Sequence, residues 1–189
     1  IDFEGRVGMR EKGKWWKVID GHPCFLADER IEKLFHLTRA WVKSSGLSYY
    51  DRKSHVGLLR YAVIRSTTLG ETMIILVTSA PIDDAERTHL LQALEQLAHA
   101  SQATTLIWSQ NNTLTDISIG ETLQTISGPG FIEEQIHTSR YRISPNAFFQ
   151  TNPRGAKILL DTVTQYCGDL SNKTLLDLYC GSGFFSIAL

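Results

Sequence analysis

One segment near the end of the sequence limits the fold more than any other. Thr174–Leu178 is a short apolar stretch that leads into the glycine-rich turn 181–183, and a helix is expected to begin near Phe184. Upstream, Asn152-Pro153 is typical of a helix N-cap followed by proline in the first turn, and Gly168 ends that helix. Helix, strand, glycine turn and helix in this order predict the entry into a parallel α/β sheet.

Residues 1–144 have a different pattern, in which short alternating stretches are interleaved with two amphipathic helices. Asp28 and Asp83 are expected N-caps, the second with Glu86 in a capping box, and Gly46 is expected to close the first helix. The sequence therefore predicts an α+β domain with an antiparallel sheet over 1–144, followed by an incomplete α/β domain over 145–189. Expected strands are a hairpin within 6–17, then 56–66, 72–79, 104–109, 122–127, 131–137 and 141–144.

Length and composition exclude several classes of protein. The chain has 189 residues, 42% hydrophobic and 21% charged, which is ordinary for a globular protein and unlike a disordered or collagen-like chain. The longest aliphatic run, Met73–Val77, has five residues, whereas a membrane-spanning helix needs about 20. The first residues carry an acidic pair and form no signal peptide. Because the chain lacks an initiator methionine and stops within an apolar run, we expect both ends to be cuts.

The three cysteines, Cys24, Cys167 and Cys180, cannot all pair, and no C-x-x-C motif indicates a zinc site. A reduced, cytoplasmic protein is the expectation. The net charge of −1 conceals a polarised chain. Residues 1–65 hold 13 Lys and Arg against 8 Asp and Glu, and residues 66–189 hold 6 against 12. The basic third could contact phosphates, or it could be solvated surface charge, and both alternatives stay open.

The glycine turn is the place in the sequence where chemistry is expected. Gly181 and Gly183 allow a sharp turn and a close approach of backbone to a ligand, and Asp177 stands just inside the expected strand. The turn is no Walker A loop, because no Gly-Lys-Ser/Thr follows, and it is no G-x-G-x-x-G loop, because Gly183 is followed by Phe184-Phe185-Ser186. A nucleophilic role for Cys180 is disfavoured, since the surrounding residues lack the G-x-C-x-G layout of a nucleophile elbow.

These residues carry a resemblance to a known family. Residues 175–186, with Asp177 and the glycine pair, resemble motif I of the class I S-adenosylmethionine-dependent methyltransferases. Tyr141–Pro153 is similar to the S-P-x-x-F-x-Q-x-N segment of the RNA (uracil-5-)-methyltransferase family, and Gly8–Cys24 and Gly120–Gly128 also fit that family. The resemblance covers nearly the whole chain. It implies that 1–144 is the family's central domain and that 145–189 begins its Rossmann-like methyltransferase domain.

The resemblance also implies roles for particular residues. It assigns contacts with S-adenosylmethionine to Gln150, Tyr179 and the loop of Gly181 and Gly183. Phe184 departs from the pattern, because many relatives have a cofactor-binding Asn there. The cofactor-binding positions expected in this chain are therefore Gln150, Asp177, Tyr179, Gly181, Gly183 and Phe184.

Cys24 matches the last of four cysteines that bind a 4Fe–4S cluster in some members of the family. The alternative is a small buried residue, since relatives without a cluster exist. The Trp15-Trp16 pair could stack on RNA bases or pack beneath the hairpin.

The family methylates C5 of uridine in ribosomal or transfer RNA through a cysteine thiolate that adds to C6 and a carboxylate base. The resemblance places both residues beyond Leu189, so no catalytic residue is expected in this chain. We expect the 189 residues to be inactive alone, to bind the cofactor weakly, and to expose a sheet edge that could pair with another chain. The alternative function is a non-catalytic module for RNA binding or assembly.

Overall fold

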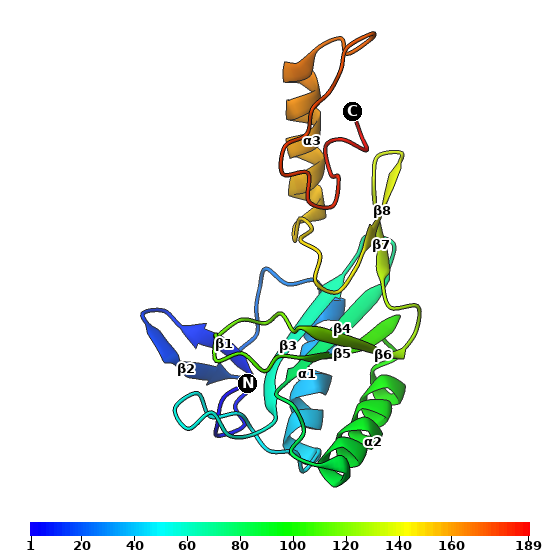
Figure 1. Cartoon of the computed structure of the whole chain (residues 1–189). Helices are drawn as coiled ribbons and strands as arrows, with labels where there is room; N and C mark the ends of the chain where they lie inside the picture. Colours follow the sequence, from blue (N-terminus) through cyan, green and yellow to red (C-terminus); the bar gives the residue numbers. More distant parts are fainter.

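The computed structural model describes the backbone of all 189 residues and every side chain except that of Trp15. A four-stranded sheet with the order β3-β4-β5-β6 lies at its centre (Figure 1). Two separate hairpins flank it, β1–β2 near the N-terminus and β7–β8 near residue 140. The elements are β1 (Gly8–Glu11), β2 (Lys14–Asp20), α1 (Glu29–Ser44), β3 (Leu59–Ser66), β4 (Thr72–Thr78), α2 (Asp84–Ser101), β5 (Thr105–Gln110), β6 (Thr122–Ser127), β7 (Ile132–Ile136), β8 (Ser139–Ile143) and α3 (Pro153–Cys167).

The central sheet separates two hydrophobic layers because successive side chains of a strand point to opposite faces. On one face, Ile74 and Leu76 of β4 pack with α1 and α2. On the other face, Met73, Ile75 and Val77 pack with β7, β8 and the start of α3. All seven residues of β4 are buried. This strand is therefore the centre of the core and links the N-terminal helices to the C-terminal part.

The helix boundaries follow the capping residues read from the sequence. Asp28, Asp83 and Asn152 are the N-caps, and each side chain accepts a backbone N–H from the first turn of its helix. Gly46 follows the end of α1 with a φ of 71°, a left-handed conformation in which glycine carries no Cβ penalty. Nearly all the expected strands are confirmed within a few residues of their expected bounds.

One feature of the predicted antiparallel sheet is wrong. β4 and β5 pair in parallel, with Met73 opposite Thr105 and Thr78 opposite Gln110, whereas the neighbouring pairs are antiparallel. The 18-residue helix α2 lies between the two strands and returns the chain to the same end of the sheet. The sheet is consequently mixed, and β4-α2-β5 is a βαβ unit.

The predicted strand at 174–178 and the helix beginning near Phe184 are also wrong for this chain. Residues 174–178 form no strand, and residues 181–188 form successive turns. A strand is stabilised by its neighbours, and no described strand lies beside this segment. In Figure 1 the segment (red) instead folds back along α3. No described helix is both long and apolar enough to cross a membrane.

Candidate functional site

An aromatic cluster joins the two motifs, 141–153 and 175–186, which lie apart in the sequence. The ring of Phe149 lies 5.9 Å from that of Phe184, and the ring of Tyr141 lies 5.4 Å and 5.6 Å from the two, measured between centroids. The Tyr141 hydroxyl donates to the Phe184 carbonyl at 3.0 Å. Gln150 is bonded to Phe149, and Gly183 is bonded to Phe184. The fold therefore brings the glutamine segment and the glycine turn to the same place.

The glycine turn has the backbone conformation that its sequence requires. Gly181 and Gly183 have φ angles of 55° and 73°, in the left-handed region. A Cβ at Gly183 would approach the Ile187 side chain to 3.0 Å, whereas one at Gly181 would meet only the Tyr179 carbonyl, at 4.0 Å. The loop is thus closed on the Gly183 side and open at Gly181, where a ligand could approach.

Asp177 has a carboxylate oxygen that a ligand could satisfy. Its Oδ2 atom is buried and has no hydrogen-bond partner among the described residues. A buried carboxylate oxygen without a donor is costly, and the cost is removed when a ligand or another segment supplies one. Tyr179 is fully exposed, with a φ of 65°.

The six predicted cofactor-binding residues differ in how far the structure brings them together. Phe184 is buried in the aromatic cluster, so it contributes packing. Gln150 is half-buried beside that cluster. Only Phe184 among the six has a described contact with the segment that contains Gln150, so their assignment to a cofactor site stays a prediction. The chain also contains a cavity of about 770 Å³, which these six residues do not line.

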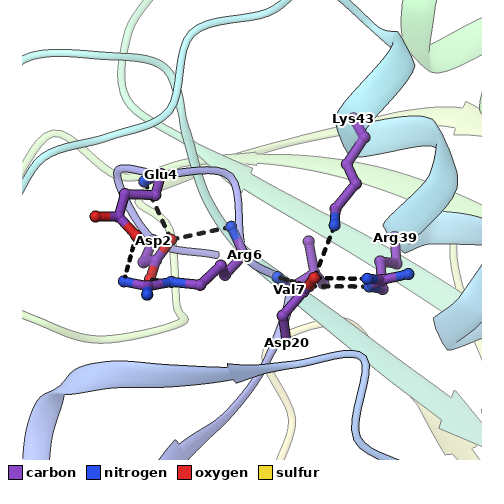
Figure 2. Close-up of polar contacts among 7 residues, drawn as sticks. All are labelled: Asp2, Glu4, Arg6, Val7, Asp20, Arg39 and Lys43. Carbon is purple, nitrogen blue, oxygen red and sulfur yellow. Dashed lines mark hydrogen bonds and ion pairs between the residues drawn. The ribbon is translucent and has the colours of Figure 1, made fainter.

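The β1–β2 hairpin forms one side of that cavity and is anchored at its base. Asp20, at the end of β2, accepts hydrogen bonds from Arg39 at 2.5 Å and 2.9 Å, from Lys43 at 2.7 Å and from the Val7 N–H at 3.0 Å (Figure 2). Hydrogen bonds from Arg39 first, and from Lys43, hold the pKa of Asp20 far below its usual range. This carboxylate fixes the base of the hairpin to α1.

A second anchor organises the loop after β5. Arg60 donates to the carbonyls of Asn111 at 2.6 Å, Thr113 at 2.8 Å and Thr115 at 2.8 Å. The Asn111 amide donates to the carbonyls of residues 117 and 119 at 3.1 Å and 2.9 Å. Both side chains are buried. The loop 111–119 is therefore held from inside the protein, although it has no regular secondary structure.

This loop presents Asp116 to two arginines from other parts of the chain. Arg10 of β1 contacts one carboxylate oxygen at 2.5 Å, and Arg52 contacts the other at 2.9 Å. The Tyr61 hydroxyl also donates to Asp116, and the Arg52 guanidinium lies 5.7 Å from the Tyr61 ring centroid. Two guanidinium groups share one carboxylate, so the cluster has one positive charge in excess. Sequence reasoning missed Asp116, because no periodicity or motif marks a loop carboxylate.

These four residues lie at a cavity of about 770 Å³ between the hairpin, α1 and β3. Its other lining is mainly apolar and includes Val18, Phe35 and Ile64. Cys24 also lines it, is half-buried, and donates its N–H to Glu32 at 2.8 Å.

A 4Fe–4S cluster needs four thiolates, and Cys24 is the only one of the three cysteines that lines this cavity. The described residues contain no group of three metal-binding side chains. This chain therefore supplies no complete ligand set, and the role of Cys24 stays a prediction.

Most of the cations in the basic N-terminal third have partners. Eight of them pair with carboxylates: Arg6, Arg10, Lys14, Lys17, Arg30, Arg39, Lys43 and Arg52. Three of the carboxylates, Glu11, Asp20 and Asp116, are each shared by two cations. The basic charge is thus concentrated in small clusters. Of the tryptophan pair, Trp16 is half exposed, and the Trp15 side chain lies outside the described residues.

Comparison with known proteins gives consistent results. Residues 27–189 match the family model described as tRNA (Uracil-5-)-methyltransferase. An uncharacterized RNA methyltransferase of Caldanaerobacter subterraneus is 33% identical, and the match covers 100% of this chain and 42% of the relative. The tRNA (uracil(54)-C(5))-methyltransferase of Pyrococcus horikoshii is also 33% identical, over 100% of this chain and 43% of its own length.

A solved structure agrees with these relatives. The crystal structure of Pyrococcus abyssi tRNA (uracil-54, C5)-methyltransferase in complex with S-adenosyl-L-homocysteine superposes with a TM-score of 0.75. The sequence identity is 26%, and the match covers 100% of this chain and 43% of that one. The chain therefore spans about two fifths of the length of its relatives. By the family model, which matches most of its length, the chain belongs to the tRNA (uracil-5-)-methyltransferase family.

Proposed function

We propose that this chain is part of an enzyme that transfers a methyl group from S-adenosylmethionine to C5 of a uridine in transfer or ribosomal RNA. The contact between the rings of Phe149 and Phe184, the sequence neighbours of Gln150 and Gly183, is the observation that carries the proposal. The family membership and the relative with bound S-adenosyl-L-homocysteine support it. The three free cysteines are in keeping with a cytoplasmic enzyme.

The proposed division of the chain is a central domain over 1–144 and the start of a Rossmann-like methyltransferase domain over 145–189. The exposed apolar side chains of 175–178 support this division, because a parallel strand of that fold is normally buried on both faces. The unpartnered Oδ2 atom of Asp177 supports it too, since a donor from a further part of the methyltransferase domain would satisfy that atom.

In this proposal Gln150, Gly181 and Gly183 hold the methionine end of the cofactor, and Tyr179 packs against it. The bound cofactor supplies an electrophilic sulfonium methyl group. Uracil C5 becomes nucleophilic when a thiolate adds to C6. The reaction therefore needs a cysteine next to the uracil ring and a carboxylate that removes the C5 proton. Cys24 lines a different cavity, and Cys167 and Cys180 are exposed. We propose that the thiolate and the base are supplied from outside these 189 residues.

Two measurements test this function. RNA from cells that lack the gene should lose 5-methyluridine at one position, and restoration of the gene should return it. Unchanged 5-methyluridine in every RNA would refute the proposal. The 189-residue chain alone should give little heat with S-adenosylmethionine in calorimetry and no methyl transfer, and activity of this chain would refute the assignment of the missing groups.

A matched pair of variants tests the glutamine in the intact enzyme. Gln150→Glu should weaken S-adenosylmethionine binding, because it replaces the amide that is proposed to contact the cofactor with a carboxylate. Gln124→Glu makes the same change at an exposed position of β6 and should leave binding unaltered. Equal binding by the two variants would remove Gln150 from the site.

A non-catalytic RNA-binding module is the second candidate function. The shared arginines at the cavity favour it, because they lie apart from the glycine turn and do not require a cofactor. Methyl transfer by the intact protein would decide in favour of the enzyme.

A further inference from the structure

The cavity between the β1–β2 hairpin, α1 and β3 has no role in methyl transfer as proposed above. Its volume of about 770 Å³ is ample for a nucleotide, and ligand pockets usually combine apolar walls with a few polar groups. Its charged lining residues are Arg10, Arg52, Asp116 and Glu32, and the first three meet at one cluster with the Tyr61 hydroxyl. The chemistry of this cluster limits what the cavity can bind.

The first limit is charge. Asp116 is the shared carboxylate of two guanidinium groups, so it neutralises only one of them. Side chains of all three residues are about one fifth to one third exposed, and solvent ions can reach them. At this cluster an incoming anion would therefore meet one positive charge in excess and two planar guanidinium groups, although the carboxylate of Glu32 also lines the cavity. Guanidinium groups bind phosphate oxygens well because their N–H donors match the geometry of the anion.

The second limit is the wall beside the arginines. Val18, Phe35 and Ile64 line the cavity, together with the partly exposed Ala62 of β3. A ring or a base can pack against such a wall, whereas a free inorganic anion gains nothing from it. The combination of a phosphate-binding pair and an apolar wall fits a nucleotide in single-stranded RNA.

We propose, resting on the RNA-modifying function above, that this cavity takes one unstacked nucleotide of the substrate RNA. Arg10 and Arg52 bind its phosphate in exchange for part of their contact with Asp116, and the base packs on the apolar wall. The cavity is then an RNA contact separate from the glycine turn.

The test measures binding of a fluorescent single-stranded oligouridylate to the 189-residue chain as a function of salt. The Arg10→Gln, Arg52→Gln double variant should bind about tenfold more weakly, because it loses charge-assisted hydrogen bonds to one phosphate. The slope of log affinity against log salt should fall by about 0.7, the contribution of one phosphate contact on a single strand. Lys157→Gln removes one positive charge on α3 and should change neither quantity appreciably.

Asp116→Asn provides the decisive variant because its expected effect has the opposite sign. It removes the internal anion while keeping a carbonyl oxygen as acceptor, so RNA affinity should rise about threefold. A residue with a purely structural role would give no increase. Ala62→Trp fills the cavity and should weaken binding without altering the salt slope. Thermal melting establishes that each variant is folded.

Equal binding by wild type, the double variant and Asp116→Asn would overturn the inference. Weakening by Lys157→Gln as large as that of the double variant would also overturn it, since binding would then depend on charge anywhere. These outcomes can be separated from those that test the enzymatic proposal. If the intact protein transfers methyl groups but the variants bind RNA as the wild type does, only the cavity assignment is refuted. Altered RNA binding without methyl transfer refutes only the enzyme.

Discussion

Two apolar segments of similar composition behave differently in this molecule. β4 has the sequence Thr-Met-Ile-Ile-Leu-Val-Thr, pairs with β3 and β5, and is entirely buried. Residues 174–178 have the sequence Thr-Leu-Leu-Asp-Leu, pair with no described strand, and leave Leu176 76% exposed. The difference shows that an apolar stretch becomes a strand only when neighbours satisfy its backbone and cover its side chains.

The largest expected effect compares two leucines in these segments. Leu76→Ala should lower the free energy of unfolding by about 3 kcal/mol, because Leu76 is fully buried and its loss leaves a cavity. Leu176→Ala removes the same atoms from an exposed position and should change stability by less than about 0.5 kcal/mol. Urea unfolding of both variants provides the measurement. Similar losses would mean that residues 174–178 are packed in solution.

A variant at the base of the β1–β2 hairpin tests whether the ion pairs of Asp20 stabilise a segment as strongly as apolar packing stabilises β4. Asp20→Asn should cost about 2 kcal/mol at pH 7, because it removes the charge that Arg39 and Lys43 contact. The pKa of Asp20 is lowered in the folded state, so its stabilisation is complete well above the unfolded value of about 3.9 and is lost as the pH falls through that value toward the folded one.

Urea unfolding from pH 7 to pH 2.5 provides the measurement for Asp20. The gap between wild type and Asp20→Asn should narrow below about pH 4. A constant gap over this range would show that the charge of Asp20 contributes nothing, and that only its shape matters.

A smaller effect is expected where the C-terminal segment contacts the core. Tyr141→Phe removes the hydroxyl that donates to the Phe184 carbonyl but keeps the ring. The expected loss of stability is about 1 kcal/mol. Amide hydrogen exchange near Phe184 should also become faster. Unaltered exchange would show that ring packing alone holds this segment.

The smallest effect concerns the exposed segment itself. The amides of residues 175–178 should exchange with solvent almost without protection in the 189-residue chain, since no strand partner covers them. The same amides should be strongly protected in the intact enzyme, if they form a strand there. Amides of Ile74 and Leu76 in β4 serve as protected controls in both proteins.

The sequence predicts local features of this fold better than long-range ones. Asp28, Asp83 and Asn152 identified all three helix starts, because an N-cap is a contact within one turn. The parallel pairing of β4 with β5 was missed, since alternation of side chains is the same for either direction. The strand expected at 174–178 was wrong for a related reason. An apolar stretch forms a strand only beside other strands, and the sequence pattern does not show which strands lie next to it.

The candidate sites show the same division. Gln150, Gly181 and Gly183 were predicted from two motifs, each of which is contiguous in the sequence. The Asp116 cluster was missed because its arginines come from residues 10 and 52, about 40 residues apart, and meet only through the anchored loop. No local pattern encodes such a meeting.

The buried contacts of Arg60 have a consequence for protein engineering. Loops of irregular structure are usually chosen to accept insertions, tags or new chain termini. Three carbonyls of loop 111–119 accept hydrogen bonds from the Arg60 guanidinium. Residues added to the loop would move these carbonyls away and leave a buried cation without partners. This loop should tolerate insertion as poorly as a core strand, whereas the exposed loop at 170–173 should accept one.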